Sequence, residues 1–159
     1  MPRRALLPGL AAALVATAWP GGASSHPYAG YPLALPETLR GSVEVPVAGG
    51  RGPPADTLRA LYRALASCWQ APEGLQRMED VQITARFSLR RDGTVIGVPQ
   101  ITFAAGVPGG EARDALVRAT LDAIARCTPA RVTPGLGAAI AGRPMALRFL
   151  YRGPQGRGI

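Results

Sequence analysis

The sequence predicts an α+β domain in which two helices cover one face of a three-stranded antiparallel sheet, in the order α-β-β-α-β. Three observations support this fold. Val81 to Arg90 alternates apolar and polar side chains, the turn dipeptide Asp92-Gly93 follows, and an amphipathic helical pattern flanks this hairpin on each side. A lone hairpin leaves its apolar face uncovered, so we expect both helices to pack on it.

Residues 1–25 have the pattern of a secretory signal. Arg3 and Arg4 precede an apolar run from Ala5 to Trp19, and small residues follow. The run is shorter than the roughly 20 apolar residues of a spanning helix. We therefore expect cleavage near Ala23 to Ser25 and a periplasmic protein, with an inner-membrane anchor facing the periplasm as the alternative.

Residues 26–55 are rich in proline and glycine and show no helical period, which predicts an extended linker or tail. Val43 to Val47 differs, because its apolar and polar residues alternate as in a short strand. This stretch is either part of a stiff linker or an edge strand that tolerates its proline.

The first helix is expected to begin after the N-cap residue Asp56 and to end near Trp69. Its apolar stripe has the three-and-four spacing of a helix and consists of Leu58, Leu61, Tyr62, Leu65, Cys68 and Trp69. A polar connection from Glu73 to Asp80 then leads into the hairpin.

The second half of the domain follows the same logic. Val95 to Phe103 forms the second, less regular strand; a helix runs from Glu111 to just before Pro129; and Met145 to Arg152 alternates as the third strand. Between them, residues 136–141 suggest a single helical turn. The domain is thus assigned to residues 56–152, followed by a flexible C-terminus at 153–159.

A fully antiparallel sheet requires the spatial order 2-1-3, with the strands numbered along the chain. The third strand then becomes a free edge. The side of the sheet that faces away from the helices carries four arginines, which we call the basic face: Arg86, Arg90, Arg148 and Arg152. This face is either a binding surface or an ordinary solvated one.

The chain contains two cysteines, Cys68 and Cys127. In an oxidising compartment a disulfide between them is the default, and two buried thiols are the alternative. The predicted helix directions separate the two residues unless the helices cross steeply or the segment from Gln70 to Asp80 runs back along the domain, because bridged Cα atoms lie within roughly 7 Å.

Composition and motifs argue against several function classes. The net charge is +8 and every basic residue is arginine, which indicates codon bias rather than nucleic-acid binding but suits an anionic membrane surface or an acidic partner. The sole histidine, His26, lies in the tail, and the adjacent acids Glu79 and Asp80 fit a solvated connection. Tyr62 and Trp69 fit core packing better than a ligand platform. We therefore expect no enzyme, no catalytic residue, no metal and no cofactor.

A free edge strand on an exported domain is suited to recognition by strand addition. The candidate edge is Ala146, Leu147, Arg148, Phe149 and Leu150. The competing hypothesis is a secreted domain that binds an anionic ligand or lipid through the basic face.

Several motifs between Thr57 and Arg152 resemble the C-terminal domain of the TonB/TolA family, closest to TolA-like forms. They are Cys68-Trp69, the turn from Leu89 to Val95, the proline after Gly97, the helix end from Arg126 to Pro129, and the last apolar strand through Phe149. The resemblance implies a periplasmic domain that binds periplasmic or outer-membrane proteins along the sheet edge, in envelope integrity or in transport as an energy transducer. The relatives carry a membrane anchor and a long spacer, which this chain lacks if its N-terminus is cleaved.

Overall fold

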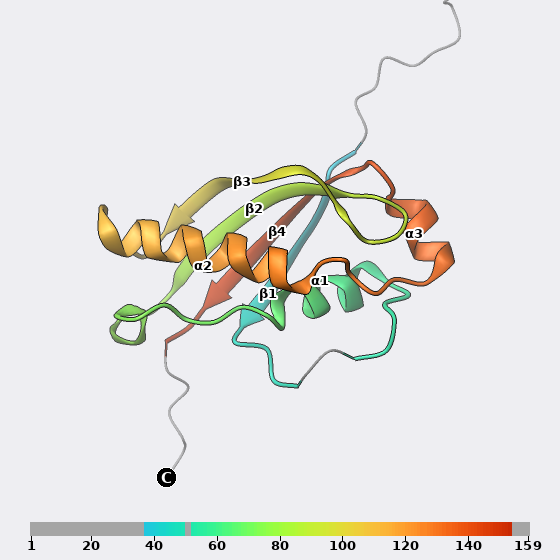
Figure 1. Ribbon diagram of the computed structural model, residues 1–159. Coiled ribbons are helices and arrows are strands. Elements are labelled where there is room, and N and C mark those ends of the chain that lie inside the picture. Colours follow the sequence, from blue (N-terminus) through green and yellow to red (C-terminus); the bar gives the residue numbers. More distant parts are fainter. Residues whose placement is uncertain (1–36, 50–51, 154–159) are drawn as a thin grey trace, which may run out of the picture. The chain divides into compact units, whose positions relative to one another are not determined.

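The centre of the fold is the hairpin of β2 (Val81–Leu89) and β3 (Val95–Ala105), which confirms the predicted strand pair. The computed structural model describes residues 37–49 and 52–153 (Figure 1). At the turn, Gly93 has a φ of 84°, a conformation that glycine adopts without strain. The Asp92 carboxylate accepts hydrogen bonds from the Thr94 hydroxyl at 2.7 Å and the Thr94 N–H at 2.9 Å. These bonds lower the pKa of Asp92 and fix the turn.

The last strand, β4 (Pro144–Tyr151), pairs antiparallel with β2, with Phe149 opposite Ile83. This part of the predicted topology is correct. The five core-facing residues of β2 are all buried, as its alternation requires: Val81, Ile83, Ala85, Phe87 and Leu89.

The sheet has a fourth strand, so the prediction of a three-stranded antiparallel sheet is wrong. Strand β1 (Leu39–Val45) pairs parallel with β4, and the order is β1-β4-β2-β3 in a mixed sheet. β1 lies inside the range assigned to the linker, where Val43 to Val47 was interpreted as either linker or edge strand; the edge-strand alternative is correct, but the strand is Leu39–Val45. Its sequence contains Arg40, Gly41 and Ser42, and only Val43 and Val45 are buried, so its signal was weak.

In the described part of the chain, three α-helices accompany the sheet. α1 (Leu58–Ala66) begins at Thr57, whose hydroxyl accepts from the Ala60 N–H at 3.3 Å, rather than at Asp56, and it ends three residues before Trp69. α2 (Glu111–Cys127) has the predicted bounds. The predicted single turn is α3 (Pro134–Ile140), with Thr133 as its N-cap. A short 3₁₀ helix, η1, covers Leu75–Arg77.

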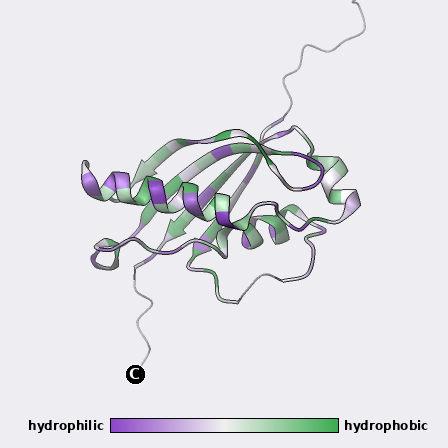
Figure 2. Cartoon of the chain, viewed as in Figure 1, coloured by the Kyte–Doolittle hydropathy of each residue, from purple (hydrophilic) through white to green (hydrophobic). Residues whose placement is uncertain are grey.

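Helices α1 and α2 pack on the core face of the sheet, as predicted. Hydrophilic residues recur in bands along α2 (Figure 2), while Leu116, Ala123 and Ile124 are fully buried beneath it. No helix packs on the opposite face of the described sheet, which we call the open face. Among the described residues, the fold thus has two layers, and no described helix covers the open face.

Residues 69–80 run back along the domain. Cys68 lies beside Cys127 at the end of α2, and nearby Ala130 donates to the Gly93 carbonyl at 2.9 Å, at the turn end of the hairpin. β2 begins at the opposite end, where Val81 pairs with Tyr151. The connection must therefore travel the length of the sheet, and its Leu75 is buried on the way. Of the two arrangements that allowed a disulfide, this is the one adopted.

The predicted signal at residues 1–25 lies outside the described residues, as does the part of the predicted linker up to residue 36. No helix within 37–49 and 52–153 has both the length and the apolar character needed to cross a membrane.

Candidate functional site

The predicted binding edge, Ala146 to Leu150, is not an edge. β4 lies between β1 and β2, with Leu147 opposite Gly41 on one side and opposite Ala85 on the other. Both of its main-chain sides are therefore occupied by neighbouring strands, and strand addition at β4 is excluded in this structure. The prediction failed because β1 had been assigned to the linker.

The basic face lies where it was expected, but two of its four residues are engaged. Arg86, Arg90, Arg148 and Arg152 are all exposed. Arg152 binds Asp80 at 3.0 Å and Glu44 at 3.6 Å. The guanidinium of Arg148 lies 5.7 Å from the centre of the Phe103 ring. The open face is therefore a partly neutralised surface rather than four unpaired cations.

The sheet has two true edges, and β3 is the irregular one. Its pairing with β2 shifts register twice, Gly97 has a φ of 70°, and Pro99 has no N–H to donate. Its three exposed apolar residues are Ile96, Val98 and Phe103. Bulges and proline are the features with which sheets protect an edge against pairing.

β1 is the regular edge. Its seven residues pair with β4 without a break in register, and no described strand lies on its other side. At about 3.3 Å per residue such a strand offers roughly 23 Å of main chain. Half of its N–H and C=O groups therefore face away from the sheet.

A groove runs beside β1 and is bounded on its other side by α1. The central part has a volume of about 600 Å³ and is lined by five consecutive residues of the strand, Arg40 to Glu44, and by Leu58, Arg59, Tyr62 and Arg63 of the helix. Consecutive strand residues point to both faces, so a hollow that contacts all five lies against the edge of the strand.

Two further hollows continue the groove in both directions. One of about 460 Å³ shares Arg40 and Leu58 with the central part. The other, of about 510 Å³, shares Val47, Ala48 and Arg63. The groove therefore follows the whole of β1 and continues past its end.

Tyr62 holds the two walls of this groove together. Its hydroxyl donates to the Leu39 carbonyl at 3.0 Å, and its ring lies against Gly41, where a Cβ atom would overlap it. Burial raises the pKa of Tyr62. Tyr62 is thus a structural residue, as predicted, and the same holds for Trp69, whose Nε1–H donates to Thr120 at 3.3 Å.

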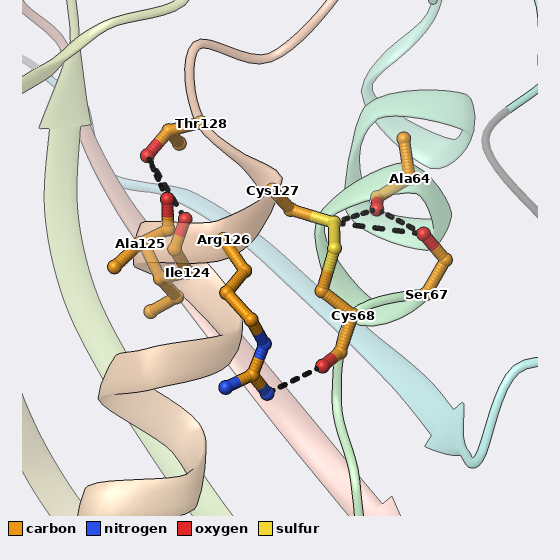
Figure 3. Close-up of a disulfide and its surroundings, with 8 residues drawn as sticks. All are labelled: Ala64, Ser67, Cys68, Ile124, Ala125, Arg126, Cys127 and Thr128. Atoms are coloured by element: carbon orange, nitrogen blue, oxygen red, sulfur yellow. Dashed lines mark hydrogen bonds between the residues drawn. A yellow bond between two sulfur atoms is a disulfide. The ribbon is translucent and has the colours of Figure 1, made fainter.

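The predicted disulfide between Cys68 and Cys127 is present, with Cα atoms 5.8 Å apart. Figure 3 shows Ser67 donating to the Ala64 carbonyl at 2.7 Å beside the bridge, and Arg126 donating to the Cys68 carbonyl at 2.9 Å. The Cys127 sulfur lies 3.0 Å from the Ala64 carbonyl oxygen, a packing contact because a bridged sulfur has no proton to donate. The bridge joins the C-terminal ends of α1 and α2.

The groove could not have been read from the sequence as a site. Arg59 and Arg63 were visible only as residues outside the apolar stripe of the first helix, and Arg40 only as part of a linker. Within 37–49 and 52–153, no cluster of three His, Cys, Asp or Glu side chains could hold a metal ion.

Comparison with known proteins gives one family. The family described as uncharacterised conserved protein UCP034077 matches residues 51–153, well over half of the chain. The matched range begins after β1 and includes every other strand and helix. Neither the curated proteins nor the solved structures contain a match to this chain.

Proposed function

The chain belongs to the UCP034077 family, and we propose that it is a non-enzymatic, exported protein-interaction domain of the TonB/TolA type that binds an extended segment of an envelope protein at the free edge of β1. The observation that carries this proposal is the regular seven-residue edge of β1 beside a groove along α1. In this mode, main-chain hydrogen bonds provide affinity and the groove selects side chains.

Strand addition would occur at β1, which is an edge of the described sheet, and not at β4, which is paired on both sides. β1 is favoured over β3, because β1 keeps one register along its length whereas β3 carries Gly97, Pro99 and two register shifts. The edge presents N–H and C=O groups at regular intervals, and an extended polypeptide is the ligand that presents acceptors and donors at the same intervals.

Export is supported by the pattern of residues 1–25 and by the disulfide, which is compatible with an oxidising compartment. A periplasmic location follows in this proposal, with an inner-membrane anchor as its alternative. A role in envelope integrity or energy transduction rests on the TonB/TolA resemblance alone.

A synthetic ten-residue peptide of alternating valine and serine tests strand addition. Amide hydrogen exchange of the full chain is measured with and without the peptide. We expect slower exchange in Leu39–Val45 and unchanged exchange in Val95–Ala105. The same peptide with every main-chain amide N-methylated is the matched control, and it should fail because it has no main-chain N–H group to donate. Protection of β3 alone, or no protection, contradicts the proposal.

A second candidate function is binding of an anionic ligand or lipid by the basic face, because Arg86 and Arg90 are exposed there. Vesicles containing phosphatidylglycerol test it. Binding that is lost in Arg86→Ser with Arg90→Ser, but kept in Arg118→Ser on α2, would favour this function over strand addition.

A further inference from the structure

We propose that the groove between β1 and α1 selects an extended acidic peptide. The inference rests on the proposed function and adds the chemistry of the bound side chains. Three exposed arginines line the central groove: Arg40 on the strand, and Arg59 and Arg63 on the helix. The one acid among the central lining residues is Glu44.

The three arginines carry charge that the described part of the protein does not neutralise. Within 37–49 and 52–153, both ion pairs belong to Arg152, and one of them holds Glu44 at 3.6 Å. Arg59 and Arg63 are four residues apart on α1, so their side chains lie on the same flank of the helix. Arg40 points to the open face, together with Ser42 and Glu44.

This placement matches an added strand, because its side chains alternate between two directions. One row would point toward α1 and meet Arg59 and Arg63, and the other would point toward the open face near Arg40. Carboxylates at alternate positions would then form charge-assisted hydrogen bonds with the helix side. Because all three arginines are exposed, salt should weaken this selection.

The apolar part of the groove favours a peptide over a small anion or a lipid headgroup. Leu58 and Val47 are half-buried at its wall, and Val43 and Tyr62 form buried surface beneath. An isolated phosphate would leave this apolar wall and the edge of β1 uncovered. A second copy of β1 is the other polypeptide that the edge admits, and the oligomeric state distinguishes it.

The experiment compares three ten-residue peptides in which valine alternates with glutamate, serine or lysine. Binding to the full chain is measured by calorimetry at about 50 and about 500 mM salt, and light scattering reports whether the protein is a monomer. We expect the glutamate peptide to bind about tenfold more tightly than the serine peptide at low salt, the lysine peptide to bind least, and the difference to shrink at high salt.

Variants locate the effect. Arg59→Glu with Arg63→Glu should reverse the preference, and the milder Arg59→Gln with Arg63→Gln should abolish it if the first pair of changes fails to fold. Arg91→Glu with Arg118→Glu reverses the same number of charges at two exposed residues outside the groove and should leave the preference unchanged. An equal loss in this control would overturn the inference, since net charge alone would then explain it.

The two proposals fail in different ways. Equal binding of the glutamate and serine peptides, with protection of β1, overturns the acidic preference and leaves strand addition standing. Binding of none of the three peptides overturns both. A stable dimer that binds no peptide assigns the edge to a second copy of the chain and also overturns the inference.

Discussion

The contact between Gly41 and Tyr62 fixes the position of β1 against α1. The Tyr62 ring occupies the space in which a side chain at residue 41 would lie, and its hydroxyl bonds to the Leu39 carbonyl. A residue with no Cβ is therefore needed at this point of the strand, although glycine usually weakens strands. The same glycine interrupts the apolar alternation, so the sequence indicated a strand only from Val43 onward.

Gly41→Ala should destabilise the protein by about 1–3 kcal/mol, because the added Cβ overlaps a buried ring and forces Tyr62 or β1 to move. Urea unfolding measures the change. Gly135→Ala is the matched control, since a Cβ at Gly135 in α3 meets open space and should be neutral or stabilise by up to about 1 kcal/mol. An equal effect of both changes would mean that the ring contact does not matter.

Tyr62→Phe keeps the ring and removes the bond to Leu39, so it should cost about 1 kcal/mol near neutral pH. Burial raises the pKa of Tyr62 above its ordinary value of 10.0, so the folded protein favours the neutral phenol. This contribution is present below pH 10.0 and is lost as the pH rises through the raised pKa. Urea unfolding against pH should show a smaller alkaline loss in Tyr62→Phe than in the wild type.

At the scale of elements, the predicted parts are those with strong local patterns. The hairpin was found because its alternation and its Asp92-Gly93 turn agree, and α2 because Glu111 and Pro129 delimit an amphipathic stretch. β1 has only a weak signal, because alternation is visible from Val43 onward and no turn dipeptide or helix-ending residue delimits the strand. Its strand conformation depends on pairing with β4, about a hundred residues later in the chain.

The disulfide between Cys68 and Cys127 connects two helices. The sequence predicted this bond, although the predicted directions of the helices separated the two cysteines. It closes a loop with a sequence separation of 59, for which chain entropy gives about 4 kcal/mol. Cys68→Ala with Cys127→Ala should lose about that amount in urea unfolding, and the reduced wild type should unfold together with this variant. If the reduced and the oxidised wild type are equally stable, the disulfide does not stabilise the protein by this amount.

At the scale of the whole molecule, one added strand changes which surface is available. The predicted three-strand arrangement is present as β4-β2-β3, and β1 covers the edge that was expected to bind partners. The groove beside α1 exists only because β1 is there. The location of the candidate site therefore depends on the order of the strands in the sheet. That order is set by pairing between strands far apart in the sequence, which local patterns do not show.

Removing β1 should recreate the edge that the sequence predicted. A chain that begins at Gly49 loses the buried Val43 and Val45, each worth roughly 1.5–3 kcal/mol, and exposes the main chain of Ala146 to Leu150. We expect lower stability in urea and self-association through paired β4 edges, detected by light scattering at several protein concentrations.

A chain that begins at Leu35 keeps β1 and should remain free of this association. In the shorter chain, Ala146→Lys should suppress it, because a lysine on an exposed edge opposes strand pairing. A shorter chain that is as stable and as monomeric as the longer one would show that β1 does not protect β4.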